Sequence, residues 1–125
     1  MLGLILTTQV VSYPMFIKVE KDFPTYHNYY VNRISLIVVP VMIIEITLSI
    51  VLLFQIKSYL TIIVFLLMLL ISLCTFFIQV PIHDKLKYNF DILLSKKLIR
   101  TNWIRVFFWF LKCIVSFMLI NTIFI

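Results

Sequence analysis

The chain contains no alanine and only one glycine, Gly3, among its 125 residues. Small residues are what let two membrane helices approach closely, so packing of the GxxxG kind is excluded. A glycine-rich phosphate-binding loop needs several glycines and is also excluded, so nothing indicates a nucleotide-dependent enzyme. Helices of this chain must instead pack through leucine, isoleucine, valine and phenylalanine side chains.

Cysteine and histidine are also scarce. Cys74 and Cys113 each lie inside an apolar run, where a thiol behaves as a small hydrophobic group, so we expect neither a disulfide nor a metal role for them. His27 and His83 lack the clustered spacing that is typical of metal sites. We predict no metal site and name no cofactor, while a metal or haem held by the two histidines stays an open alternative.

Acidic residues number only 5, against 11 Lys and Arg, which gives a net charge of +6. In a soluble protein this excess would suggest nucleic acid, but basic residues also collect in the cytoplasmic loops of membrane proteins. Two connections and the adjoining helix ends hold nine of the eleven basic residues. We therefore predict no nucleic-acid partner, and a multi-pass protein of a bacterial inner membrane with both termini outside and the charged loops cytoplasmic.

Apolar residues, in contrast, make up 63% of the chain, and the mean hydropathy is +1.13. Such a chain has the lipid bilayer as its solvent, and a span needs about 20 residues. The sequence predicts one domain, 1–125, folded as an all-α antiparallel bundle of four transmembrane helices, with interfacial helical segments in the first and third connections. Because the first run lacks a basic start and a cleavage site, we expect a retained helix. The predicted spans are 2–17, 34–54, 59–80 and 103–124.

Three polar residues lie deep inside the predicted spans. At 1.5 Å per residue, Glu45 is about 16 Å from the end of its span, and Gln9 and Lys112 are roughly 12 to 14 Å deep. An ionised group at this depth costs at least about 2.5–3.5 kcal/mol, so each needs an interior partner. We predict a Glu45–Lys112 ion pair with Gln9 completing its hydrogen bonds. A pair that only fixes helix register is the alternative.

Further polar residues repeat at helical spacing in the last two spans. Residues 72, 75, 79 and 83 form one stripe and residues 102, 105, 109, 112 and 116 another. We expect the stripes to meet around a cavity that opens toward the cytoplasmic interface and takes an aromatic, quinone-like or lipid ligand. Snorkelling of His83 and Arg105 to headgroups is the alternative. Predicted catalytic residues are His83, Arg105 and Glu45. Predicted ligand-binding residues are Tyr13, Gln79, Asn102, Gln9 and Lys112.

Three short motifs carry a resemblance: Tyr13-Pro-Met15, Val80-Pro-Ile-His83-Asp-Lys-Leu86 and Asn102-Trp-Ile-Arg105. In this order they resemble the small four-helix integral membrane proteins grouped with anthrone oxygenases, most of which have no known function. That family often has Asn in place of His83 and Thr in place of Val106. The resemblance implies an antiparallel four-helix bundle and the oxidation of an aromatic or quinol-like substrate without a tightly bound cofactor.

The sequence leaves two functions open. One is a small membrane enzyme or binder with a polar intramembrane pocket, and the resemblance implies that such an enzyme is a cofactor-free oxygenase or oxidoreductase. The other is a non-catalytic accessory subunit of a larger membrane complex, whose polar residues only order its own bundle. Proton or ion movement ranks last, because no discontinuous helix or repeat of the transporter kind is visible. A homo-oligomer and a larger complex both stay open.

Overall fold

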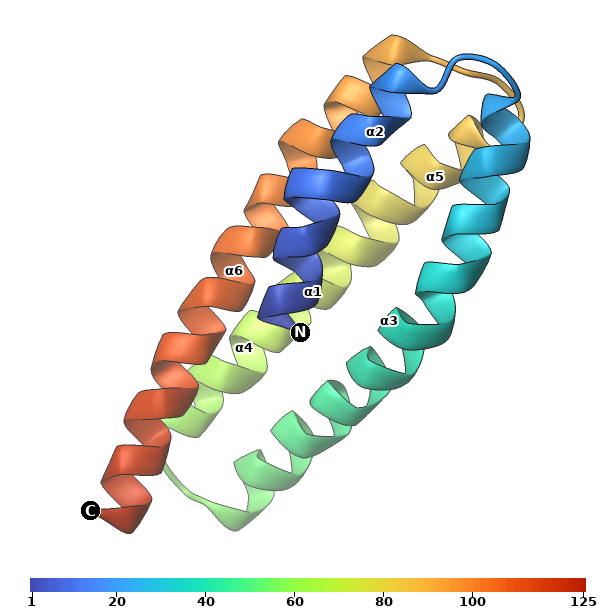
Figure 1. Ribbon diagram of the computed structural model, residues 1–125. Helices are drawn as coiled ribbons and strands as arrows, with labels where there is room; N and C mark the ends of the chain where they lie inside the picture. Colours follow the sequence, from blue (N-terminus) through green and yellow to red (C-terminus); the bar gives the residue numbers. More distant parts are fainter.

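A computed structural model describes all residues, 1–125, and every regular element in it is helical. Successive helices run in opposite directions and lie side by side as one bundle (Figure 1). The predicted all-α, antiparallel bundle is therefore confirmed. Its elements are α1 (Leu2–Thr7), η1 (Thr8–Ser12), α2 (Tyr13–Lys18), α3 (Phe23–Gln55), α4 (Tyr59–Cys74), η2 (Thr75–Gln79), α5 (Val80–Leu86) and α6 (Ile92–Phe124).

Three helices are long and apolar enough to cross a membrane, namely Phe23–Gln55, Tyr59–Leu86 and Ile92–Phe124. The first helix, Leu2–Lys18, is apolar but shorter. The helical segments expected in the first and third connections are continuous with the long helices, because α3 and α6 begin well before residues 34 and 103. At the start of α6, the Asp91 carboxylate accepts hydrogen bonds from the first free backbone N–H groups, which fixes the helix end there.

Two prolines shape the helices around the polar residues. Pro14 and Pro81 each follow a π-helical turn, η1 and η2 respectively. Proline has no N–H and its ring clashes with the carbonyl four residues earlier, and a widened π turn relieves that clash. The helix therefore continues past Pro81 to Leu86. Each π turn carries one buried glutamine, Gln9 in η1 and Gln79 in η2.

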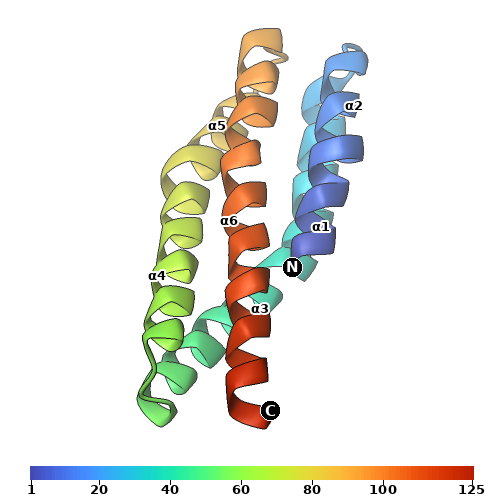
Figure 2. The same ribbon diagram turned by 90° about the vertical axis from the view of Figure 1, so that its left-hand side faces the viewer.

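Helix α6 lies at the centre of the packing. It runs along α4 and also against α1 and α2, whereas α3 packs on α4 (Figures 1 and 2). The N-terminal part of α3 also contacts the first helix, where Phe16 of α2 packs against His27 and Tyr30 of α3. Two apolar clusters form the core. One contains Ile5, Met42, Met68, Ile71, Val106 and Trp109, and the other contains Tyr13, Phe16, Phe23, Ile82, Leu86 and Leu98. Along α6 the polar side chains of Asn102 and Arg105 lie between these two clusters.

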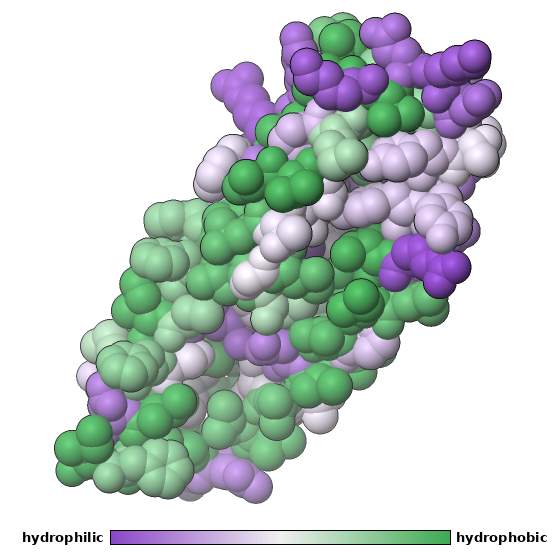
Figure 3. All heavy atoms as spheres, viewed as in Figure 1, coloured by the Kyte–Doolittle hydropathy of each residue, from purple (hydrophilic) through white to green (hydrophobic).

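The molecular surface supports a membrane location. Hydrophobic side chains cover most of the visible length of the bundle, and hydrophilic ones gather at the end where the α2–α3 and α5–α6 connections lie (Figure 3). Many large apolar side chains are exposed on α3, α4 and α6. In water such a surface would be unusual. The chain is a membrane protein, and these side chains contact lipid.

Candidate functional site

Arg105 is the most unusual side chain of the interior. It is only 4% exposed, and a series of hydrogen-bonded amide groups fixes its position. Its Nη1 donates to Asn102 Oδ1 at 3.1 Å, and Asn102 Nδ2 donates to Gln9 Oε1 at 2.7 Å. Gln9 Nε2 in turn donates to the carbonyl of Ile99 at 3.0 Å. These bonds fix the position of the guanidinium without supplying a negative charge.

No carboxylate compensates that positive charge. The two ion pairs of the structure join Lys87 to Asp84 and Lys112 to Glu45. Arg105 belongs to neither, and its Nε atom is buried without a hydrogen-bond partner. A buried charge without a partner is strongly unfavourable. Arg105 thus has no countercharge within the chain, and one of its hydrogen-bond donors is unused.

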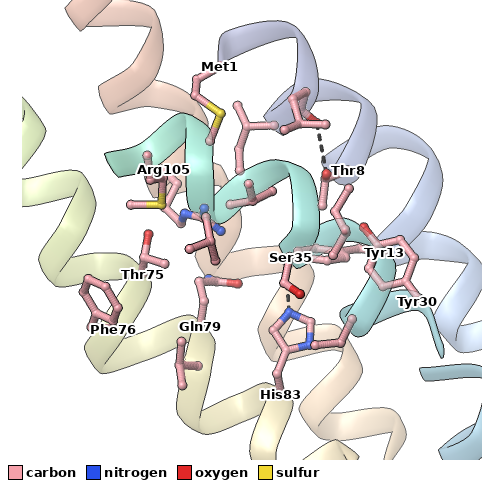
Figure 4. A pocket seen from close by; sticks show the side chains of 18 of the residues that line it. Met1, Thr8, Tyr13, Tyr30, Ser35, Thr75, Phe76, Gln79, His83 and Arg105 are labelled. Atoms are coloured by element: carbon pink, nitrogen blue, oxygen red, sulfur yellow. Dashed lines mark hydrogen bonds between the residues drawn. The ribbon is translucent and has the colours of Figure 1, made fainter. Parts of the chain in front are cut away.

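A cavity of about 260 Å³ lies beside Arg105, between α3, the first helix and the helix Tyr59–Leu86. Helix α3 contributes a mainly apolar wall that includes Ile34, Val38 and Met42. The other elements contribute polar groups, and Figure 4 shows Tyr13, Gln79, His83 and Arg105 among the side chains around the cavity. One wall therefore suits hydrocarbon and the other suits a polar head.

Gln79 lies on the polar wall, on the same helix as His83. Its Nε2 donates to Thr101 Oγ1 at 3.0 Å, whereas its Oε1 is buried without a partner. The Tyr30 hydroxyl, which belongs to another lining residue, is also buried and unpaired. The cavity wall thus carries an unused acceptor and an unused hydroxyl in addition to the unused donor of Arg105.

Tyr13, His83 and His27 form a hydrogen-bonded chain that leads away from the cavity. The Tyr13 hydroxyl lies 3.2 Å from His83 Nε2, and His83 Nδ1 lies 2.9 Å from His27 Nε2. His27 is fully buried against Phe16 and Phe23. The two histidines thus meet as a hydrogen-bonded pair, and no group of three His, Cys, Asp or Glu side chains is placed to hold a metal ion.

The predicted ion pair of Glu45 and Lys112 is present, with Lys112 Nζ 2.5 Å from Glu45 Oε2. Lys112 also lies over the ring of Trp109, 5.4 Å from its centroid. However, these residues line a second cavity, together with Cys113 and Ser116, and not the cavity beside Arg105. Glu45, predicted as a catalytic residue, and Lys112, predicted as a ligand-binding residue, therefore do not line the cavity beside Arg105.

The prediction that Gln9 completes the hydrogen bonds of this ion pair is also wrong. Gln9 is bonded to Asn102 and to the Ile99 carbonyl. The predicted fourth span begins at residue 103, next to Asn102, but α6 begins at Ile92, so that Asn102 lies about three turns inside the helix. Lys112 is a further 10 residues along, about 15 Å away from Asn102 along the helix axis.

Two contributors were not predicted as site residues, Thr101 and Tyr30. Thr101 is next to Asn102, which rotates it about 100° away from the predicted stripe, so the stripe did not include it. Tyr30 lies three residues after His27, which puts both side chains on one face of α3. That spacing was the available signal.

The rim of the bundle carries an exposed ion pair. Lys87 Nζ lies 2.8 Å from Asp84 Oδ1, and both side chains are about half exposed. The hydrogen bond and the charge of Asp84 raise the pKa of Lys87. In the same connection, Asn28 Nδ2 donates to the carbonyl of Lys87 at 3.4 Å, which ties the α5–α6 connection to α3.

No protein-family model matches this chain, and neither a curated protein nor a solved structure matches it. The fold and the interior define an all-α membrane protein with a polar site among apolar helices. The resemblance to anthrone-oxygenase-like proteins stays a prediction.

Proposed function

We propose that this protein binds a bilayer-resident amphipathic molecule in the cavity beside Arg105. The head of the molecule is anionic or a strong hydrogen-bond acceptor, and its oxygen atoms take the donors of Arg105. Its apolar part lies along α3. The observation that carries the proposal is a buried guanidinium that faces an otherwise largely apolar cavity and has no carboxylate partner.

The free-energy cost of an unpaired buried donor favours a ligand head that carries oxygen atoms. A buried donor without a partner loses about 1–3 kcal/mol, and more if it is charged. Hydrogen bonds from a guanidinium to an anionic oxygen are among the stronger ones in proteins. A ligand that supplies such oxygens therefore recovers free energy that the chain alone forgoes at Arg105.

The size of the cavity limits how much of the ligand is enclosed. A volume of about 260 Å³ corresponds to about nine water-sized groups at about 30 Å³ each. This accommodates a ring-sized head or a carboxylate with a short length of chain. Exposed apolar residues stand at the cavity edge, with Val39 and Ile43 on α3 and Phe76 and Val80 opposite. A longer tail would pass between them into the lipid.

The charged end of the bundle is, in this proposal, the cytoplasmic one, because it carries most of the basic residues. The ligand head then lies in the cytoplasmic half of the membrane. The resemblance to anthrone-oxygenase-like proteins favours an aromatic or quinone-like head and extends the proposal to chemistry on it. In this proposal Arg105 and His83 contact that head, whereas Glu45 lines the other cavity and does not.

The direct test is mass spectrometry of small molecules extracted with the purified protein. We compare the wild type with Arg105→Gln, and use Arg100→Gln as the matched control because Arg100 is exposed on the same helix. The wild type and Arg100→Gln should retain an amphiphile, and Arg105→Gln should retain at least about tenfold less, as expected for loss of a charged hydrogen bond.

Equal retention by all three proteins would contradict the proposal. Purification of the wild type without any amphiphile, but in strict association with other chains, would contradict it as well. That second outcome would favour the accessory-subunit function.

A further inference from the structure

The chain of Tyr13, His83 and His27 has an unusual feature, which is that neither of its ends is fixed. At one end the Tyr13 hydroxyl lines the cavity. At the other end His27 Nδ1 is buried without a hydrogen-bond partner. In most proteins the second nitrogen of such a histidine bonds a carbonyl or carboxylate, and this bond decides which nitrogen carries the proton. No such bond fixes which ring nitrogen of His27 carries the proton.

Two proton arrangements therefore fit the same heavy-atom positions. In the first, His27 Nε2–H donates to His83 Nδ1 and His83 Nε2–H donates to the Tyr13 oxygen, so the Tyr13 proton is free to donate into the cavity. In the second, Tyr13 donates to His83 Nε2 and His83 Nδ1–H donates to His27 Nε2, so the Tyr13 oxygen is free to accept. Each arrangement holds three protons on three neutral groups and satisfies both observed hydrogen bonds.

We infer that this chain lets the cavity accept a ligand head in two forms, one with a carbonyl oxygen and one with a hydroxyl group at the same position. In the first arrangement the carbonyl form accepts a hydrogen bond from the Tyr13 hydroxyl. In the second the hydroxyl form donates a hydrogen bond to the Tyr13 oxygen. Conversion of the first arrangement into the second moves one proton along each of the two hydrogen bonds, releases one proton from Tyr13 to the cavity and takes up one proton at His27 Nδ1, so three protons remain and only O–H and N–H bonds change. The inference rests on the proposed function and narrows its ligand class to molecules such as quinones and their quinols.

A site with a fixed donor behaves differently. It leaves a buried polar group unpaired when the other form binds, and this costs about tenfold or more in affinity. A chain whose proton direction is free avoids that penalty, since both forms find a partner. Similar affinity for both forms is therefore the signature of the inferred arrangement.

The test uses a short-chain prenylated 1,4-benzoquinone and its quinol as probes, with dodecanoate as a third probe, and the full-length protein in detergent micelles under anaerobic conditions. We expect dissociation constants for quinone and quinol within about threefold of each other. Nitrogen-15 NMR of labelled histidine should show His83 protonated at Nε2 with the quinone and at Nδ1 with the quinol. Tyr13→Phe should weaken both forms about fivefold, as expected for one lost hydrogen bond, whereas the exposed Tyr29→Phe should not.

Four other outcomes overturn the inference. A preference of tenfold or more for one form, or the same His83 tautomer with both probes, shows that the direction is fixed. Binding of dodecanoate in an Arg105-dependent way, without binding of either quinone form, overturns the inference but leaves the proposed function standing. Failure of all three probes to bind overturns both. The NMR measurement needs no variant, so poor folding of Tyr13→Phe does not prevent the test.

Discussion

Helix α6 buries two cations two turns apart, Arg105 and Lys112, and their surroundings differ. Lys112 has its carboxylate in Glu45, at 2.5 Å, and stacks over Trp109. Arg105 has the neutral amide of Asn102 as its hydrogen-bond partner and a cavity in front of it. The first arrangement includes a countercharge from the chain, and the second does not.

The distribution of the five acidic residues explains this difference. Glu45 pairs with Lys112, Asp84 pairs with Lys87, and Asp91 caps α6. Glu20 and Asp22 lie in the α2–α3 connection, at the end of the bundle. None is left for Arg105. The Glu45–Lys112 ion pair is complete, and it stabilises the bundle or fixes its register. Arg105 has no countercharge in the chain, and we propose that the ligand head binds there.

The largest effect is expected at the complete pair. Glu45→Gln leaves Lys112 without a countercharge and should lower the free energy of unfolding by about 2–3 kcal/mol, somewhat below a fully buried pair because Glu45 is 26% exposed. The double variant Glu45→Leu/Lys112→Met removes both charges and should recover most of the loss. Unfolding in sodium dodecyl sulfate measures both, and a double variant as unstable as the single one would show that the charges are not the cause.

Removal of a charged side chain at Arg105 should not lower the free energy of unfolding, in contrast to Glu45→Gln. Arg105→Met removes an uncompensated charge, so we expect the ligand-free protein to be unchanged or more stable by about 1 kcal/mol. The same unfolding measurement, made after removal of bound amphiphiles, provides the comparison. Destabilisation as large as that of Glu45→Gln would mean that Arg105 is compensated within the chain after all.

A smaller effect should follow from the loss of the Gln79 side chain amide. Gln79→Leu removes a buried acceptor that has no partner and a donor to Thr101, so stability should change by less than about 1 kcal/mol. Affinity for an acceptor head should change less than in Arg105→Gln. Ligand retention measured in parallel with Arg105→Gln gives the ranking, and a larger loss in Gln79→Leu would place the head against Gln79 and away from Arg105.

The smallest effect is expected at the exposed rim. Lys87→Gln breaks the ion pair with Asp84, and exposed pairs contribute little. We expect no measurable change in the thermal midpoint at neutral pH. Because the pKa of Lys87 is raised in the folded state, its contribution is fully present at neutral pH and is lost only as the pH rises through that raised value. A difference between wild type and variant that appears near pH 6 would contradict this.

Much of the architecture was predictable from the sequence, because apolar runs determine membrane helices and their order. The Glu45–Lys112 pair was predictable too, since two opposite charges at similar depth have few other partners. The environment of Gln9 was not, because it depends on where α6 begins, and that start is set by the Asp91 cap and not by hydropathy. The link between His27 and His83 depends on how α3 packs near α5, which helical periodicity does not specify.

The most direct test of the central claim gives Arg105 a countercharge from the chain itself. Asn102→Asp places a carboxylate where Asn102 Oδ1 now accepts from Arg105 at 3.1 Å, and the variant is compared with the wild type by mass spectrometry of co-purified amphiphile. If Arg105 recruits the ligand through its uncompensated charge, Asn102→Asp should retain about tenfold less of it, because the guanidinium is already paired. Retention equal to that of the wild type would contradict the account.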